Sequence, residues 1–185
     1  MSRPEYTLPQ ESRSRSGSIL SRDFVRAILL GADENLQRDG SLQPVLFLRL
    51  KNGKRGIVPL ELPETHAEKE MYFAGLGLFV ARTSGPLDEA VFVSESWYVS
   101  PEQGTDFSRI RPSRHPLRQE AILISGRNAA ETREAFVIQT FGRDAQNRPV
   151  PGAVMVEEYH DTTDDEPGLH AVSLLDYLFP PRERA

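Results

Sequence analysis

The stretch Glu89-Ala90-Val91-Phe92-Val93-Ser94-Glu95-Ser96-Trp97-Tyr98-Val99 decides the fold, together with the later run Glu120-Ala121-Ile122-Leu123-Ile124-Ser125-Gly126. Both are largely apolar and of strand length, so they predict two β-strands. The connection between them, from Val99 to Leu117, is long for a compact domain. Loops of this length are usually functional, bound to a partner or mobile, and a loop held by a rigid sheet often carries binding residues.

Three segments have the periodicity of amphipathic helices: residues 19–31, with a continuation toward Leu36, residues 66–82, and residues 169–179. The predicted buried faces consist of Leu20, Phe24 and Ile28 in the first helix, of Tyr72, Phe73, Leu76, Phe79 and Val80 in the second, and of Leu174, Leu175 and Leu178 in the third.

The second of these helices begins with a capping box, in which Thr65 and Glu68 stand three residues apart. Gly75 and Gly77 lower its helix propensity. A close approach of the helix to the sheet would explain why these two glycines are there.

Further strands are predicted at residues 44–50, 55–60, 132–141 and 150–159. Asn52-Gly53 joins the first two as a hairpin because both residues tolerate the positive φ angles of a type I′ turn. Pro59 lacks the N–H that a ladder needs, so the second strand is expected to lie at an edge or to end there. In the third of these strands, Glu134, Phe136 and Ile138 alternate with Arg133, Val137 and Gln139.

Short connections between strands favour antiparallel neighbours. The expected fold is therefore α+β: one mainly antiparallel sheet, built from the hairpin and a β-meander, with two or three helices packed on one face. We expect a mobile Ser/Arg-rich tail at residues 1–17, one domain at 18–180 and a C-terminal tail at 181–185.

Composition excludes several classes of function. The chain has 185 residues, no cysteine and a net charge of −5, so disulfides, thiolate nucleophiles, Fe–S clusters and cysteine-type zinc sites are excluded. An acidic chain is poorly suited to coating nucleic acid, although a local basic patch could still bind it. The longest apolar run is too short to span a bilayer, and no secretory signal is found at the N-terminus, so we expect a cytoplasmic protein without membrane contact.

The loop between the two opening strands is the main candidate site, because guanidinium groups suit bidentate recognition of phosphate or carboxylate. Pro112 and Pro116 would stiffen the loop and lower the cost of ordering it on binding. In the alternative interpretation, the arginines form surface ion pairs with Glu95 and Glu120, and the loop is only a connection. The predicted ligand-binding residues are Arg109, Arg111, Arg114, His115 and Arg118 of the loop, with Trp97 and Glu95 on the preceding strand.

Trp97 and Tyr98 are neighbours on a strand, so they point to opposite faces of the sheet. One is expected to pack under the helices, and the other to contact solvent, a partner or the arginine loop. An exposed aromatic residue beside arginines is typical of an interface hot spot. The alternative is that both are ordinary core or half-buried sheet residues.

Two other clusters are weaker candidates. The stretch from Glu157 to Glu166, with His170 after it, contains carboxylates and imidazoles but matches no calcium loop, so a solvated acidic turn is expected and no metal site is predicted. His66 and Glu68 lack the second histidine of a metalloprotease helix, and Glu68 is explained by the cap.

Motifs for nucleophilic catalysis, phosphate loops, kinases and dinucleotide binding are absent, so no catalytic residue and no cofactor are predicted. The first hypothesis is a non-catalytic module that uses the arginine loop to bind an anionic ligand, an acidic protein partner or, through an edge strand, a second copy of itself. The second is an enzyme acting on an anionic small molecule such as a phosphoester, with His115 or an acid between Glu157 and Asp165 as base. The third is a nucleic-acid accessory protein that uses the N-terminal tail and the loop.

Overall fold

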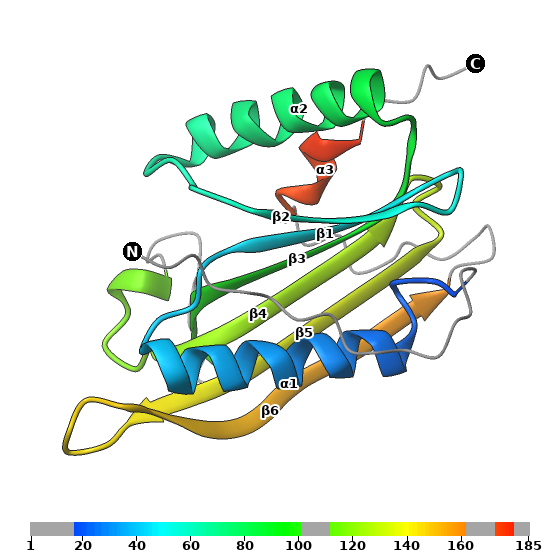
Figure 1. Cartoon of the computed structure of the whole chain (residues 1–185). Helices are drawn as coiled ribbons and strands as arrows, with labels where there is room; N and C mark the ends of the chain where they lie inside the picture. Colours follow the sequence, from blue (N-terminus) through cyan, green and yellow to red (C-terminus); the bar gives the residue numbers. More distant parts are fainter. Residues whose placement is uncertain (1–16, 101–111, 162–172, 180–185) are drawn as a thin grey trace.

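The computed structural model describes residues 17–100, 112–161 and 173–179, and it confirms the α+β class. Six strands form one sheet in the order β2-β1-β3-β4-β5-β6, and every neighbouring pair is antiparallel (Figure 1). No helix in the described ranges is long and apolar enough to cross a membrane. The elements are α1 (Arg22–Asp39), β1 (Val45–Leu50), β2 (Arg55–Pro59), α2 (His66–Thr83), β3 (Leu87–Tyr98), the 3-10 helix η2 (Pro112–Arg114), β4 (Gln119–Asn128), β5 (Arg133–Arg143), β6 (Pro149–Asp161) and α3 (Leu175–Leu178).

The predicted hairpin and meander are both present. Strands β1 and β2 flank Asn52-Gly53, so the hairpin is confirmed. The predicted type I′ turn is wrong, because Gly53 has a positive φ of 80° but Asn52 does not. As expected from the proline, β2 ends at Pro59 and forms one edge of the sheet. The four strands from β3 to β6 follow one another in the sheet in chain order, which places the end of β3 beside the start of β4.

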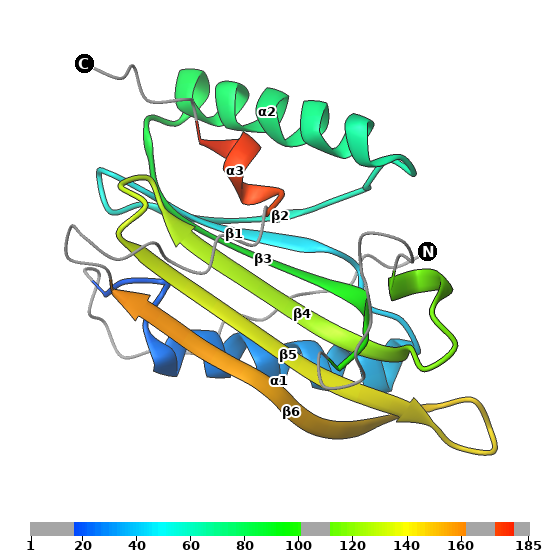
Figure 2. The same ribbon diagram turned by 180° about the vertical axis from the view of Figure 1, so that it is seen from behind.

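The helices cover both faces of the sheet, so the prediction of helices on one face is wrong. Helix α1 crosses one face, whereas α2 and α3 lie on the other (Figures 1 and 2). Val91 and Val93 belong to the core under α1, and Ala90 and Phe92 belong to the core under α2 and α3. Successive positions of β3 are apolar because the strand is buried on both faces, a pattern that differs from the alternation of a strand with one wet face.

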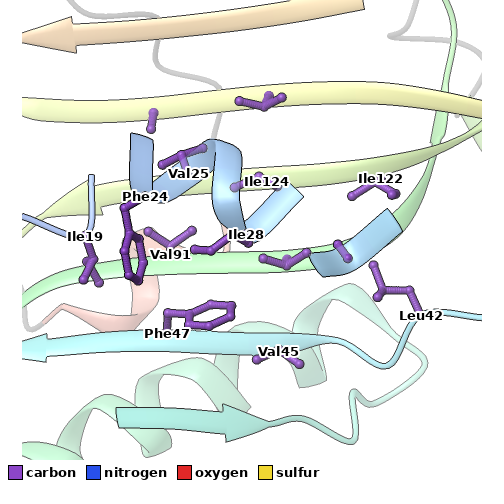
Figure 3. Packing of buried hydrophobic residues seen from close by; sticks show 14 of the residues in the cluster. Ile19, Phe24, Val25, Ile28, Leu42, Val45, Phe47, Val91, Ile122 and Ile124 are labelled. Carbon is purple, nitrogen blue, oxygen red and sulfur yellow. The ribbon is translucent and has the colours of Figure 1, made fainter. Parts of the chain in front are cut away.

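The core under α1 forms as the apolar periodicity of that helix predicts. Phe24, Val25 and Ile28 point toward the sheet and meet side chains from β1, β3 and β4 (Figure 3). The rings of Phe24 and Phe47 make an edge-to-face contact with centroids 6.2 Å apart. Ser21 caps the helix by accepting a hydrogen bond from the Phe24 N–H, and Gly40 ends it with a φ of 77°.

The core under α2 uses a different helix face from the predicted one. Phe73 and Val80 are buried as expected, but Phe79 is 63% exposed, so its assignment to the core is wrong. Helix α2 is apolar on much of its circumference, and periodicity alone did not identify the stripe that Phe73, Gly77 and Val80 form. The capping box of Thr65 and Glu68 is confirmed.

Helix α1 also buries part of a carboxylate, which leads to a prediction about pH. Burial raises the pKa of Asp33 above its ordinary value, and hydrogen bonds with Gln139 and Gln37 offset part of that shift. Its Oδ1 atom is buried without a hydrogen-bond partner. Because the folded-state pKa is raised, the ionised group costs stability above that pKa, and the cost fades as the pH falls toward the pKa of the unfolded chain.

We therefore expect Asp33→Asn to raise the melting temperature at pH 7, with a difference from the wild type that shrinks as the pH falls to about 3. Melting curves between these pH values measure this. The matched control is Asp23→Asn in the first turn of α1, where the carboxylate favours the helix and its loss lowers the melting temperature slightly. A wild-type-to-variant difference that grows as the pH falls contradicts the assignment to Asp33.

Candidate functional site

The candidate site lies where β3 ends and β4 begins. The two strands pair so that Trp97 stands opposite Glu120 and Tyr98 opposite Gln119. Arg118 directly precedes β4, so the sheet brings it beside Trp97 although 21 positions separate the two in sequence. A rigid sheet thus holds both side chains at the same end of neighbouring strands.

Arg118 and Trp97 form a cation–π pair. The guanidinium carbon of Arg118 lies 4.8 Å from the centre of the Trp97 ring. Arg118 is exposed, and Trp97 is 41% exposed, so solvent reaches both members of the pair. Arg114, in η2, is exposed nearby in the chain. We call these three residues the Arg–Trp surface.

The carboxylates that were expected to neutralise the arginines are engaged elsewhere. Glu95 accepts a hydrogen bond from the Leu42 N–H. Glu120 forms a two-pronged ion pair with Arg143, with nitrogen-to-oxygen distances of 2.9 and 3.0 Å, and this contact raises the pKa of Arg143. Within the described part of the chain, neither Arg114 nor Arg118 makes an ion pair. Glu95 was predicted to bind ligand, and the structure gives it a role in fixing the chain before β1.

His115 is buried and holds a turn through its hydrogen bonds. It is only 9% exposed, and its Nδ1 accepts a hydrogen bond from the Leu117 N–H at 3.1 Å. Its carbonyl oxygen accepts bonds from the backbone N–H of Arg118 at 3.2 Å and from the Arg118 side chain at 3.4 Å. The residue therefore fixes the turn that aims Arg118 at Trp97. Arg109 and Arg111, the other predicted binding residues, lie outside the described residues.

Trp97 and Tyr98 face opposite sides of the sheet, as strand geometry requires. The Trp97 ring contacts the Arg118 guanidinium, whereas Tyr98 lines a pocket on the side of the sheet where α3 lies. This pocket has a volume of about 760 Å³. Its lining comes from β3, β4, β5 and β6, from Glu131, and from α3 with the two residues before it. We call it the sheet pocket.

Sequence reasoning did not identify the sheet pocket, although one signal pointed to it. Phe136 and Ile138 were assigned to one face of a strand, and both are half-exposed. In the part of the chain that the structure describes, the helix next to them, α3, has only 4 residues. An apolar strand face without a predicted element to cover it is the signal. The pocket is lined by Phe92, Tyr98, Leu123, Ser125, Gly126, Arg127, Glu131, Glu134, Ala135, Phe136, Ile138, Val156, Glu158, His160, Ser173, Leu174 and Asp176.

The other acidic candidates are distributed over separate surfaces. Residues 157–161 are the last residues of β6, whereas residues 162–166 and His170 lie outside the described residues. Among the described residues, no group of three histidine, aspartate or glutamate side chains could hold a metal ion. His66 pairs with Glu70 at 3.2 Å on the surface of α2, while Glu68 closes the capping box.

Comparisons with known proteins gave no relative: no family model, no curated protein and no solved structure matches the chain.

Proposed function

We propose that the protein is a non-catalytic binding module that recognises an acidic protein partner through the Arg–Trp surface. The observation that carries this proposal is the stacking of exposed Arg118 on exposed Trp97 at the end of a rigid sheet. Arginine and tryptophan are the residue types most enriched in interface hot spots. A guanidinium held in a fixed position loses little freedom when it binds a carboxylate.

The exposure of the Arg–Trp surface favours a protein partner over a small molecule. Small ligands bind in concave sites that bury most of their surface. Trp97, Arg114 and Arg118 do not line the sheet pocket, and Arg114 and Arg118 are exposed. With Glu95 and Glu120 engaged by other groups, a carboxylate of the partner supplies the counter-ion that the described chain does not.

The test is a titration with a hexaglutamate peptide, followed by the fluorescence of the only tryptophan in the chain. Arg118→Gln is expected to weaken binding of the peptide about tenfold. Trp97→Phe removes the fluorescent side chain, so its binding is measured by calorimetry. It is expected to be weakened by a similar factor, because hot-spot side chains act together. Added salt is expected to weaken wild-type binding, since exposed charges are screened.

The matched control is Lys54→Gln, which removes an exposed charge from the β1–β2 turn, away from Trp97 along the sheet. It is expected to bind hexaglutamate like the wild type. Equal binding of hexaglutamate by the wild type and Arg118→Gln, or equal binding of a hexaglutamine peptide, would refute the proposal.

The enzyme hypothesis gains no support from the geometry. His115, which was the first choice as general base, is buried, is not among the residues that line the sheet pocket, and its Nδ1 is occupied by the Leu117 N–H. A general base must reach the proton of a bound substrate. We therefore keep the binding module as the single proposed function.

A further inference from the structure

We propose that the sheet pocket is a second binding site, separate from the Arg–Trp surface, and that it takes a small organic amine with an apolar body. The pocket lies on the face of the sheet that carries α3, whereas Trp97 points to the opposite face. Its volume of about 760 Å³ is within the usual range for sites that bind small molecules.

The floor of the pocket changes from apolar to charged along the strands. The pairing of β4, β5 and β6 sets Leu123, Ile138 and Val156 side by side in one row. The next row on this face, two residues away on each strand, contains Ser125, Phe136 and Glu158. The third row, two residues beyond the second, contains Arg127, Glu134 and His160. Cross-strand neighbours on one face are close enough for one ligand to contact all three rows.

The charged end of the pocket is acidic. Arg127 is the only arginine or lysine among its lining residues, and it already forms ion pairs with Asp176 and with Glu131, the latter at 2.8 Å. These contacts neutralise the guanidinium and leave two further carboxylates, Glu134 and Glu158.

Neither of these carboxylates has a strong cationic partner. Glu134 makes no ion pair within the described residues, and Glu158 has only the imidazole of His160, at 3.6 Å. They lie on neighbouring strands one row apart, beside Phe136. A cationic group between them compensates charges that are partly removed from water, while the rest of the ligand covers the apolar rows.

This arrangement selects among ligand charges. An anionic group at this end would meet Glu134, Glu158, Glu131 and Asp176, with Arg127 already paired. Like charges in a partly desolvated site repel. An ammonium group is therefore favoured over a neutral or anionic group on the same apolar body.

The experiment uses three probes that share one apolar body: 4-phenylbutylamine, 4-phenylbutanol and 4-phenylbutyrate. Calorimetric titration of the full chain at pH 7 is expected to give the tightest binding for the amine, about tenfold tighter than for the alcohol, and the weakest for the carboxylate. Equal affinity for all three overturns the cationic part of the proposal. Tightest binding of the carboxylate, or no binding of any probe at millimolar concentration, overturns it as a whole.

Variants locate the binding. The double variant Glu134→Gln with Glu158→Gln is expected to bind the amine no better than the alcohol, with alcohol binding unchanged. The matched control removes two exposed carboxylates elsewhere, Glu61→Gln with Glu64→Gln, and should keep the tenfold preference. A preference that survives the first double variant contradicts the assignment of the charge contacts.

Filling the pocket provides an independent check. Ile138→Trp is expected to abolish binding of both the amine and the alcohol, and Val156→Trp on the edge strand is a second filling variant in case the first does not fold. Unchanged binding in a folded filling variant overturns the location. Arg118→Gln should leave amine binding intact. The proposal for the sheet pocket and the proposal for the Arg–Trp surface can therefore be refuted independently.

Discussion

Glu89→Leu is expected to lower the free energy of unfolding by about 3–5 kcal/mol, the usual cost of removing one partner of a buried ion pair. Glu89 is 2% exposed on β3. Its carboxylate accepts hydrogen bonds from the Ser18 hydroxyl at 2.7 Å and the Ile19 N–H at 2.8 Å. It also pairs with Arg49 at 3.0 Å and Arg133 at 3.4 Å. One carboxylate thus fixes the chain that enters α1 to strands β1, β3 and β5.

The matched control for this prediction is Glu157→Leu. Glu157 pairs with Arg26 at 2.8 Å, a shorter contact than either ion pair of Glu89, but the Arg26 side chain is 55% exposed. Surface ion pairs contribute about 0–1 kcal/mol, so this variant should be close to the wild type. Urea unfolding curves compare the two. Similar losses in both variants, or a loss below about 1 kcal/mol for Glu89→Leu, would contradict the role of Glu89.

Gly77→Ala is the second change with a large expected effect. A Cβ at this position would overlap the carbonyl oxygen of Leu178 and would lie 2.9 Å from its carbonyl carbon. The obstacle is backbone, so α2 and α3 must move apart. Overpacking of this kind costs about 1–3 kcal/mol. Leu175 and Leu178, buried at 0% and 1% exposure, would lose part of their packing.

Gly75→Ala, two residues earlier on the same helix, provides the contrast. A Cβ there meets nothing within 4 Å. Replacing a helical glycine with alanine gains up to about 1 kcal/mol. The two variants, compared by urea unfolding, are therefore expected to shift stability in opposite directions. A stabilising Gly77→Ala would show that α3 does not pack against α2 at this position.

Local signals in the sequence predicted most of the elements. The hairpin at Asn52-Gly53, the capping box at Thr65 and the proline that ends β2 depend on neighbouring residues, and all three are confirmed. The turn type is not, because Gly53 alone of the Asn-Gly pair has a positive φ. The two glycines of α2 show where local reasoning stops. Both glycines were expected to allow a close approach of α2 to the sheet. Of the two, only Gly77 lies close to another element, and that element is α3.

The distribution of helices over two faces could not be obtained from periodicity. An apolar run such as Ala90-Val91-Phe92-Val93 indicates a strand buried on both sides, but it does not say which helix covers which side. The wrong assignment of Phe79 to the core has the same cause. Helix α2 has apolar residues around much of its circumference, so periodicity does not show which of them face the sheet. Long-range packing decides these choices.

The candidate site was predicted in part. Composition and spacing identified the arginine loop beside the only tryptophan, but not that Arg118 would stack on it. His115 and Glu95 were chosen for their chemistry, but their hydrogen bonds give them structural roles. The partner of Glu95, Leu42, is 53 residues away and is brought near only by the fold, whereas the partner of His115, Leu117, is two residues away. The sheet pocket needed the strand register, which sequence alone does not give.

The central claim is that an acidic partner binds at the stacked pair of Arg118 and Trp97. The chain has one tryptophan, so its nitrogen-15 NMR spectrum contains a single indole N–H resonance, which belongs to Trp97. On titration with hexaglutamate, this resonance is expected to move progressively in the wild type and in Lys54→Gln, and to need about tenfold more peptide for the same movement in Arg118→Gln. An indole resonance that stays fixed in the wild type, while backbone amides elsewhere move or no resonance moves at all, would contradict the claim.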